Sequence, residues 1–190
     1  MTTIGFIRHG STAWNKEKRS QGLSNIPLDE AGLLQADKLG ERIRNEKWDV
    51  VYASDLSRAR ATAEAIERLA NLPLLLDVRL REASGGEIEG TTEQERIEKW
   101  GEDWRSLDLG IESAESVIAR AMPVVDEIME KHCGKNVLIV SHGAFTRHML
   151  KALVPSIDLT VSPKNTSITR LVKTDAGWDC ELYNCTIHLG

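Results

Sequence analysis

The chain lacks any apolar run as long as the ~18–20 residues that a membrane-spanning helix needs. Its longest apolar runs, Leu72–Leu76 and Val137–Val140, have only the length of a strand. Residues 1–10 contain no basic segment followed by an apolar one, so we expect no secretory signal peptide. We therefore expect no membrane among the partners of this protein.

An excess of positive charge is also missing, because 24 Lys and Arg stand against 29 Asp and Glu. Proteins that bind nucleic acid usually carry a basic footprint, so we expect no nucleic-acid partner. Cysteine is scarce, since Cys133, Cys180 and Cys185 are odd in number and form no C-x-x-C pattern. This usage indicates reduced thiols in a cytoplasmic protein, with the cysteines as small core hydrophobes.

The 190 residues, of which 41% are hydrophobic and 28% charged, are typical of a globular protein. This length predicts a single domain over residues 1–190, and no repeat or linker divides it. A polar stretch at about 85–112 predicts a small helical insertion. Within it, Trp100 and Trp104 have helical spacing, and we expect them to pack the insertion onto the body.

Strand and helix patterns alternate along the chain. The strand patterns cover residues 3–8, 49–54, 72–80 and 136–141. The helical patterns cover 29–45, 55–70, 112–132 and 143–154. Pro73 places the third strand at an edge, and Pro123 should kink or break a helix. Residues 167–173 and 179–188 predict a C-terminal hairpin.

This alternation predicts an α/β fold, a three-layer sandwich with a mostly parallel sheet. The most apolar strand, at 136–141, should be central, because strands buried on both faces are continuously apolar. In such sheets, ligands bind beyond the carboxyl ends of the strands. The residues that follow the strands therefore decide where a site is expected.

Ionisable side chains follow all four predicted strands: Arg8-His9-Gly10, Ser54–Arg58, Arg81-Glu82 and Ser141-His142-Gly143. Two arginines and a histidine can neutralise a dianion, while a second histidine can attack phosphorus. A carboxyl group can protonate the leaving oxygen and then activate water. The set predicts phosphoryl transfer through a phosphohistidine, with no metal and no other cofactor.

An ordered series of motifs carries a resemblance to a known family. Residues 8–15, R-H-G-S-T-A-W-N, resemble the R-H-G-[ES]-T-x-W-N signature of the histidine phosphatase superfamily, the phosphoglycerate-mutase-like group. The further matching segments are 21–22, 27–28, 32–36, 54–63, 80–90, 140–143 and 165–168. The resemblance extends from about residue 4 to about residue 170, and the ordered set is far more specific than R-H-G alone.

The resemblance implies a role for each candidate residue. His9 would be the phosphorylated nucleophile, with its other ring N–H bonded to a nearby backbone carbonyl. Glu82 would be the general acid and then the base, and we expect apolar surroundings that raise its pKa. The implied phosphate-binding residues are Arg8, Asn15, Gln21, Gly22, Arg58 and His142.

Two departures from the family pattern concern the pocket. Residues 83–88 are small where relatives more often have large apolar or aromatic residues, which implies a wider pocket or a less firmly placed Glu82. Ser11 stands where many relatives have glutamate, which implies a pocket with one carboxylate fewer. We expect substrate specificity to come from 83–90, 91–110 and the loop around Lys164.

Several other polar residues have simpler interpretations. We expect Arg81 to form a structural salt bridge. The Lys16–Arg19 run is most simply a solvated loop, although it follows the phosphate signature and could steer anions. His132, His148 and His188 are expected at the surface, in the second layer of the site and in the terminal strand, respectively. The histidine spacings match no metal-ligand pattern, so we expect no metal site.

The favoured function is a metal-independent phosphomonoesterase acting on a small phosphorylated metabolite. A cofactor-dependent phosphoglycerate mutase is an alternative, but the short segment between Gly90 and Glu112 favours a phosphatase by resemblance. A non-catalytic module that binds a phosphorylated ligand is a second alternative, which the retained histidines, arginines and acid disfavour. The expected partner is a small phosphate ester, and the terminal hairpin offers an edge for a homodimer.

Overall fold

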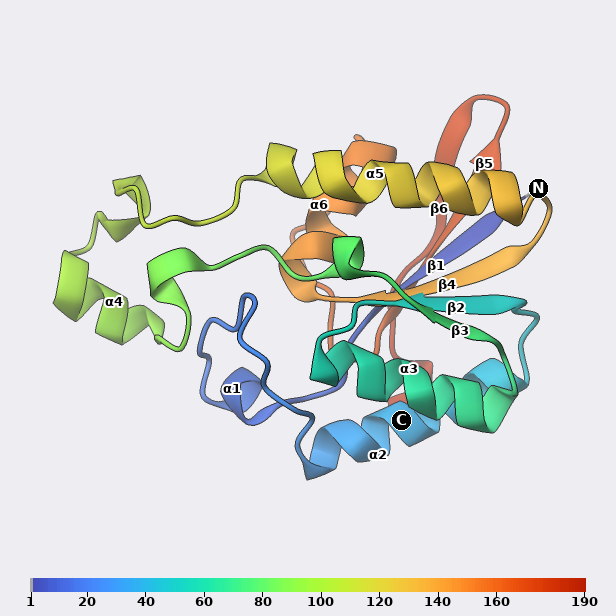
Figure 1. Ribbon diagram of the computed structural model, residues 1–190, viewed down its shortest axis with the longest axis horizontal. Helices are drawn as coiled ribbons and strands as arrows, with labels where there is room; N and C mark the ends of the chain where they lie inside the picture. Colours follow the sequence, from blue (N-terminus) through green and yellow to red (C-terminus); the bar gives the residue numbers. More distant parts are fainter. Residues whose placement is uncertain (1) are drawn as a thin grey trace.

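The computed structural model describes residues 2–190 and contains a six-stranded sheet in the order β3-β2-β4-β1-β5-β6 (Figure 1). The strands are β1 Thr3–Arg8, β2 Val50–Ala53, β3 Leu74–Leu76, β4 Asn136–Ser141, β5 Ile168–Thr174 and β6 Gly177–Cys185. The pairs β1–β4, β2–β4 and β2–β3 are parallel, whereas β5 and β6 are added antiparallel. The predicted mostly parallel sheet, its central strand at 136–141 and the C-terminal hairpin are confirmed.

Helices cover both faces of this sheet (Figure 1). α2 (Glu30–Arg44) and α3 (Ser57–Ala70) lie on one face, and α5 (Ala114–Lys131) and α6 (Gly143–Leu153) lie on the other. α1 (Ala13–Lys16) and α4 (Glu93–Trp100) are short and lie beyond the end of the sheet. The 3₁₀ turns are Val78–Leu80, Gly86–Ile88, Trp104–Ser106 and Ile187–Leu189.

The alternation of side chains along the central strand builds two apolar cores. Val137 and Ile139 of β4 pack toward α5 and α6, whereas Leu138 and Val140 pack toward α2 and α3. On the second face, Gly40 lets α2 and α3 approach closely, because a Cβ there would lie 2.9 Å from the Ala65 carbonyl oxygen. Burial on both faces explains the unbroken apolar run of this strand.

One predicted strand is shorter than expected, and one of the two alternatives predicted at Pro123, a break in the helix, is absent. The third strand was expected over 72–80 but covers only Leu74–Leu76, because Asp77 accepts a hydrogen bond from the Arg79 N–H and starts a 3₁₀ turn. Its edge position is confirmed. The helix α5 passes through Pro123 without a break. Pro123 is exposed, so water can bond the carbonyl group that its missing N–H leaves free.

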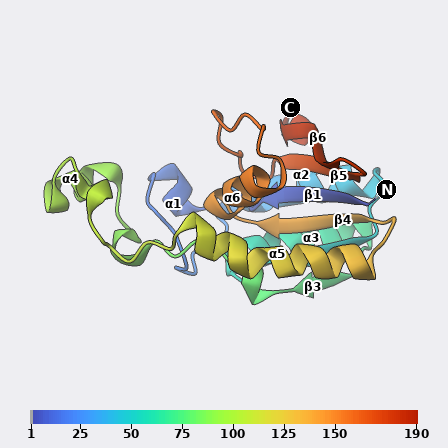
Figure 2. The ribbon, with the colours of Figure 1, turned by 90° about the horizontal axis from the view of Figure 1, so that it is seen from above.

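The insertion has a small core of its own. Ile88, Trp104 and Leu109 are buried together, with Ile97 and Trp100 packed against them. The expectation that the two tryptophans pack the insertion onto the body is therefore wrong. Figure 2 shows α4 standing apart from the layers of helix and sheet.

Two further expectations about single residues are corrected. The cysteines are not core residues, because Cys133 is exposed after α5 and Cys180 and Cys185 are half-buried on the edge strand β6. His188 lies in the 3₁₀ turn after β6 rather than in the strand. No helix within residues 2–190 is long and apolar enough to cross a membrane.

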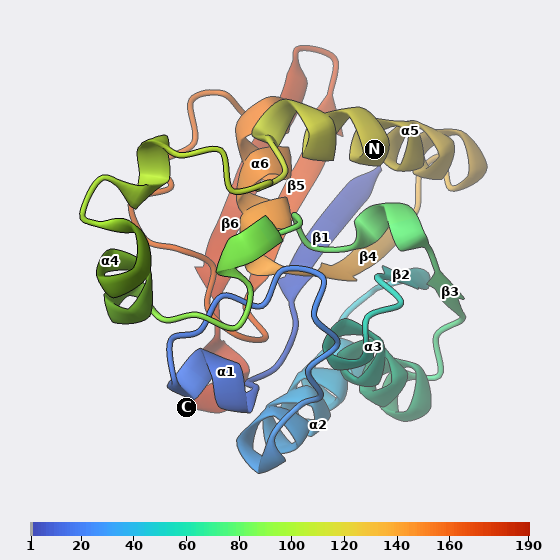
Figure 3. The same ribbon diagram turned by 60° about the vertical axis from the view of Figure 1, so that its left-hand side comes forward.

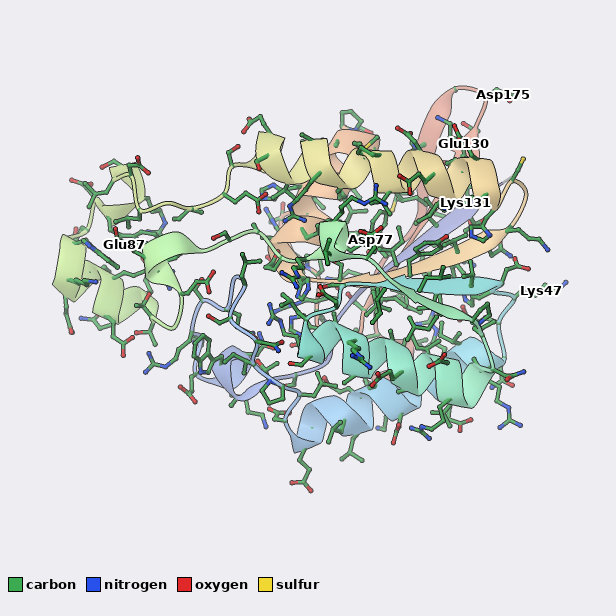
Figure 4. The ribbon with its side chains drawn as sticks, viewed as in Figure 1. Lys47, Asp77, Glu87, Glu130, Lys131 and Asp175 are labelled. Atoms are coloured by element: carbon green, nitrogen blue, oxygen red, sulfur yellow. The ribbon has the colours of Figure 1, made fainter. Side chains whose placement is uncertain are left out.

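The carboxyl ends of the parallel strands face the side of the molecule that carries the insertion. Glu87, on the Gly86–Ile88 turn, lies on this side, whereas Lys47 and Asp175 lie at the opposite end of the sheet (Figure 4). α1, α4 and the start of α6 are arranged around these strand ends (Figure 3). The predicted site residues are therefore placed beneath the insertion.

Candidate active site

A cavity of about 400 Å³ opens at the carboxyl ends of the parallel strands. It is lined by seven of the predicted site residues, namely Arg8, His9, Asn15, Gln21, Gly22, Arg58 and Glu82. The eighth, His142, does not line the cavity but lies behind His9, fully buried, with the two ring centroids 5.3 Å apart. The structure thus brings together the residues that the strand ends and the motifs predicted.

His9 is held in one orientation by the backbone. Its Nδ1 lies 2.7 Å from the Gly10 carbonyl oxygen, which can only accept, so Nδ1 carries the proton and Nε2 keeps its lone pair. The backbone acceptor expected from the family is therefore present. Burial, and then the charges of Arg58 and Arg8, hold the pKa of His9 well below its ordinary value. His9 is neutral near pH 7 and available as a nucleophile.

His142 is oriented by a hydroxyl group from the neighbouring strand. Its Nε2 lies 2.8 Å from Oγ of Ser54, which also accepts a hydrogen bond from the Leu56 N–H. Within residues 2–190, Nε2 of His142 is the only acceptor within hydrogen-bond distance of the Ser54 hydroxyl, so the Ser54 O–H donates to Nε2 and the proton of the neutral ring resides on Nδ1. Burial, and then the charge of Arg58, keep the pKa of His142 well below its ordinary value. The buried Nδ1 has no partner within residues 2–190, so it can donate to a bound anion.

Two guanidinium groups face the cavity without a carboxylate partner in the described chain. Arg58 donates to the carbonyls of Gly22 and Ser24, and Arg8 donates to the carbonyl of Pro163. The buried Nε of each has no hydrogen-bond partner among residues 2–190. Burial lowers the pKa of Arg58 to about 10 and also lowers that of Arg8, yet both stay charged at neutral pH. These two unpaired cations, Arg58 buried and Arg8 half-buried, could together hold a dianion.

The loop that holds Arg58 is fixed by Glu89, a residue without an individual role in the sequence interpretation. The Glu89 carboxylate accepts from the backbone N–H groups of Leu23, Ser24 and Gly85. Burial raises the pKa of Glu89, but these bonds and the Ser24 hydroxyl hold it below its ordinary value. Gly22 has φ +49°, and a Cβ there would lie 2.0 Å from Oε1 of Glu89. Glycine is therefore required beside the carboxylate.

Glu82 lies at the N-terminus of α6. Its carboxylate accepts from the backbone N–H groups of Ala83, Ala144 and Phe145, at 2.9, 3.0 and 2.7 Å. The expectation of apolar surroundings is wrong, because the Glu82 carboxylate is surrounded by backbone N–H donors, and two of them belong to the first turn of α6. The three bonds also place Glu82 firmly, despite the small residues that follow it.

Asn15 lines the cavity, and its side-chain oxygen is occupied, which leaves its amide nitrogen without a partner in residues 2–190. Oδ1 accepts from the N–H and hydroxyl of Thr12 and from Nδ2 of Asn165. Gln21 also lines the cavity, and its buried Oε1 has no partner within residues 2–190. Ser11 does not line the cavity, since its hydroxyl donates to Asp29. Ser11 thus contributes neither to the lining nor to the charge of the pocket.

Two further arginines, which the sequence interpretation did not place at the site, also line the cavity. Arg19 was assigned to a solvated loop, but it is half-buried and paired with Glu17 and Glu95. Arg147, on α6, was given no role. Its signal in the sequence is the spacing of four residues from Gly143, which puts both on one helix face.

The remaining candidates lie outside the cavity. Arg81 forms the expected salt bridge, to Asp55, at 2.5 Å. His148 lies outside the cavity, on another part of the surface. His132 is half-buried and bonded to the Tyr52 hydroxyl, and His188 is bonded to the Thr166 hydroxyl. No group of three or more His, Cys, Asp or Glu residues in the described part of the chain is placed to hold a metal ion.

Known proteins share both the sequence and the fold. A sequence profile of the histidine phosphatase superfamily (branch 1) matches residues 4–186. The chain belongs to this superfamily. The uncharacterized phosphatase PhoE of Bacillus subtilis (strain 168) is 29% identical over 100% of this chain and 97% of the relative. A probable phosphoglycerate mutase GpmB of Yersinia pestis (strain Pestoides F) is 31% identical over 100% and 95%.

Phosphatases are prominent among the similar proteins of this histidine phosphatase. A metal-independent phosphoserine phosphatase of Arabidopsis thaliana is 36% identical over 77% of this chain and 66% of the relative. Among solved structures, a mycobacterial glucosyl-3-phosphoglycerate phosphatase has a TM-score of 0.88 at 25% identity, covering 96% of this chain and 99% of the other. An Entamoeba histolytica phosphoserine phosphatase has a TM-score of 0.84 at 28% identity over both full chains. The enzyme class is a phosphoric monoester hydrolase of histidine phosphatase type.

Proposed function

We propose that this protein hydrolyses phosphate monoesters of small metabolites through a phosphohistidine on His9, without a metal ion. The observation that carries the proposal is the pair of guanidinium groups with buried, unpartnered Nε atoms, Arg8 and Arg58, beside the free Nε2 of His9. An anion of two charges, such as a phosphoryl group, would satisfy both. Asn15 and Nδ1 of His142 would supply further donors to its oxygens.

In the first step, Nε2 of His9 attacks phosphorus, and the N–P bond forms as the P–O bond to the leaving group breaks. Glu82 gives its proton to the leaving oxygen, so an alcohol departs. In the second step, Glu82 takes a proton from water, the water oxygen attacks phosphorus, and the N–P bond breaks to release phosphate.

The proposal is tested by hydrolysis of p-nitrophenyl phosphate in the presence of EDTA, with the wild type and His9→Ala. We expect the variant to lose activity by orders of magnitude, because the residues of one catalytic unit fail together. His148→Ala is the matched control, since His148 lies outside the cavity. Wild-type activity that EDTA abolishes, or that His9→Ala retains, would refute the phosphohistidine route.

A phosphoglycerate mutase is the second candidate, because relatives named as probable mutases match the whole chain. A mutase returns the phosphoryl group to a sugar acid instead of to water. Conversion of 3-phosphoglycerate to 2-phosphoglycerate that depends on 2,3-bisphosphoglycerate, with little phosphate release, would favour this candidate. Release of phosphate as the main product favours the phosphatase.

A further inference from the structure

We infer that Arg147 selects phosphate monoesters whose alcohol part carries a carboxylate group. The inference rests on the proposed function and adds a specificity-determining residue to it. Arg147 lines the cavity from α6. Its Nη1 donates to the Leu159 carbonyl at 2.7 Å and to the Ser162 hydroxyl at 3.3 Å.

Arg147 is a cation without a counter-ion in residues 2–190. No carboxylate of the described chain lies within ion-pair distance of it, whereas Arg19 in the same wall is paired with Glu17 and Glu95 at 2.7 and 2.6 Å. Arg8 and Arg58 already match the two charges of a phosphoryl group. The positive charge of Arg147 is therefore available to pair with a further negative group on the substrate.

The position of Arg147 puts that group on the alcohol part. The Glu82 carboxylate is bonded to the N–H groups of Ala144 and Phe145, in the first turn of the helix that carries Arg147. Gly143 and Arg147 are four residues apart on this helix, and both line the cavity. The alcohol that Glu82 protonates therefore departs past the side of the cavity where Arg147 lies.

The donors of Arg147 fit a carboxylate. Nη1 is held by Leu159 and Ser162, whereas Nε and Nη2 donate to no group within residues 2–190. Two parallel N–H groups of a guanidinium match the two oxygens of one carboxylate. The segment around Ser162 thus fixes the guanidinium, and its remaining edge is left for the substrate.

The test compares two substrates that differ only in the group concerned, 3-phosphoglycerate and glycerol 3-phosphate, by phosphate release. We expect the wild type to prefer 3-phosphoglycerate. Arg147→Gln should lower kcat/KM for 3-phosphoglycerate about 10- to 100-fold, mainly through KM, because a charge-assisted pair is lost. For glycerol 3-phosphate, the change should stay within about 3-fold. Arg147→Lys, which keeps the charge, should retain part of the preference.

Lys151→Gln is the matched control, because Lys151 lies one turn further along α6 and its ammonium bonds the Pro155 carbonyl. This change removes the same charge and should affect neither substrate. An equal fall in kcat/KM for both substrates with Arg147→Gln would show that Arg147 only holds the segment at Leu159 in place. An unchanged kcat/KM for both substrates would show that Arg147 does not contact the substrate. Either result overturns the inference but leaves the proposed function intact, provided that p-nitrophenyl phosphate is still hydrolysed through His9.

Discussion

The hydroxyl of Ser54 and Nε2 of His142 lie 2.8 Å apart, and both side chains are fully buried. Ser54 follows β2 and His142 follows β4, and the two strands are parallel neighbours. The Ser54 N–H also donates to the Val140 carbonyl, so the register of the sheet fixes the distance between the two side chains. The ladder of the central strands thereby sets which ring nitrogen of His142 is left without a partner in residues 2–190, namely Nδ1.

Ser54→Ala should lower kcat/KM for p-nitrophenyl phosphate about 10- to 100-fold, because the tautomer of His142 is no longer fixed and a buried nitrogen is left without a partner. The free energy of unfolding should fall by about 1–3 kcal/mol for the same reason. The measurements are steady-state kinetics and denaturant unfolding. Ser57→Ala is the control, since the Ser57 hydroxyl has no partner in the described chain. Equal kinetics in the two variants would contradict the role of Ser54.

Arg58→Met should weaken anion binding strongly, because it removes the fully buried one of the two unpaired cations at the site. The measurement is the rise in Tm that orthovanadate, a phosphate analogue, causes. We expect a clear rise in the wild type and none in Arg58→Met at the same concentration, since binding should weaken at least about 10-fold. Arg60→Met is the control, because Arg60 is exposed and paired with Glu64. A similar rise in Arg58→Met would remove Arg58 from the anion site.

Much of the site could be predicted because the carboxyl ends of the parallel strands lie close together. Arg8, His9 and His142 directly follow apolar runs, and the carboxyl ends of parallel strands share one edge of a sheet. The edge position of the third strand also follows from one residue, Pro73, which has no N–H for a ladder. These features depend on local sequence and on a general rule of topology.

Other features depend on contacts between distant segments, which no local pattern shows. The surroundings of Glu82 are polar because Ala144 and Phe145 bring a helix N-terminus to it. The free edge of Arg147 exists because Leu159 occupies its other side. Trp104 has the spacing of a residue that packs onto the body, yet it packs within the insertion. The spacing of residues along a sequence predicts which of them share one face of a helix, but it does not predict the surface against which that face packs.

The stability of the protein should fall in mild acid. Burial holds the pKa of His9 and His142 well below the ordinary ~6.5 of the unfolded chain, and burial lowers that of His188 to about 4. Below pH ~6.5, the unfolded chain therefore binds more protons than the native one, so protonation favours unfolding. Each histidine should remove about 1.4 kcal/mol per pH unit once the unfolded chain is protonated, and nothing above neutrality.

This pH dependence is measured by denaturant unfolding between about pH 5 and pH 7, where carboxylates remain ionised in both states. His142→Asn should make the slope shallower, because it removes one of the fully buried histidines. An increase in the free energy of unfolding on acidification would contradict the burial of neutral histidines.

Gly22→Ala should weaken the protein and its anion site together. Gly22 has φ +49°, and the added Cβ would lie 2.0 Å from Oε1 of Glu89 and 2.7 Å from the backbone nitrogen of Gly85. Backbone strain alone costs about 1–2 kcal/mol, and the clash adds to it by displacing the carboxylate that holds this loop. Because the Gly22 carbonyl accepts from Arg58, KM for p-nitrophenyl phosphate should also rise.

The matched control for this change is Gly101→Ala. Gly101 has φ +84°, but nothing lies within 4 Å of the position of its Cβ, so only the strain applies there. Denaturant unfolding should therefore show a larger loss of stability for Gly22→Ala than for Gly101→Ala, and only Gly22→Ala should raise KM. Equal losses of stability in the two variants, with KM unchanged, would mean that the Glu89 carboxylate does not hold the loop whose carbonyl groups bind Arg58.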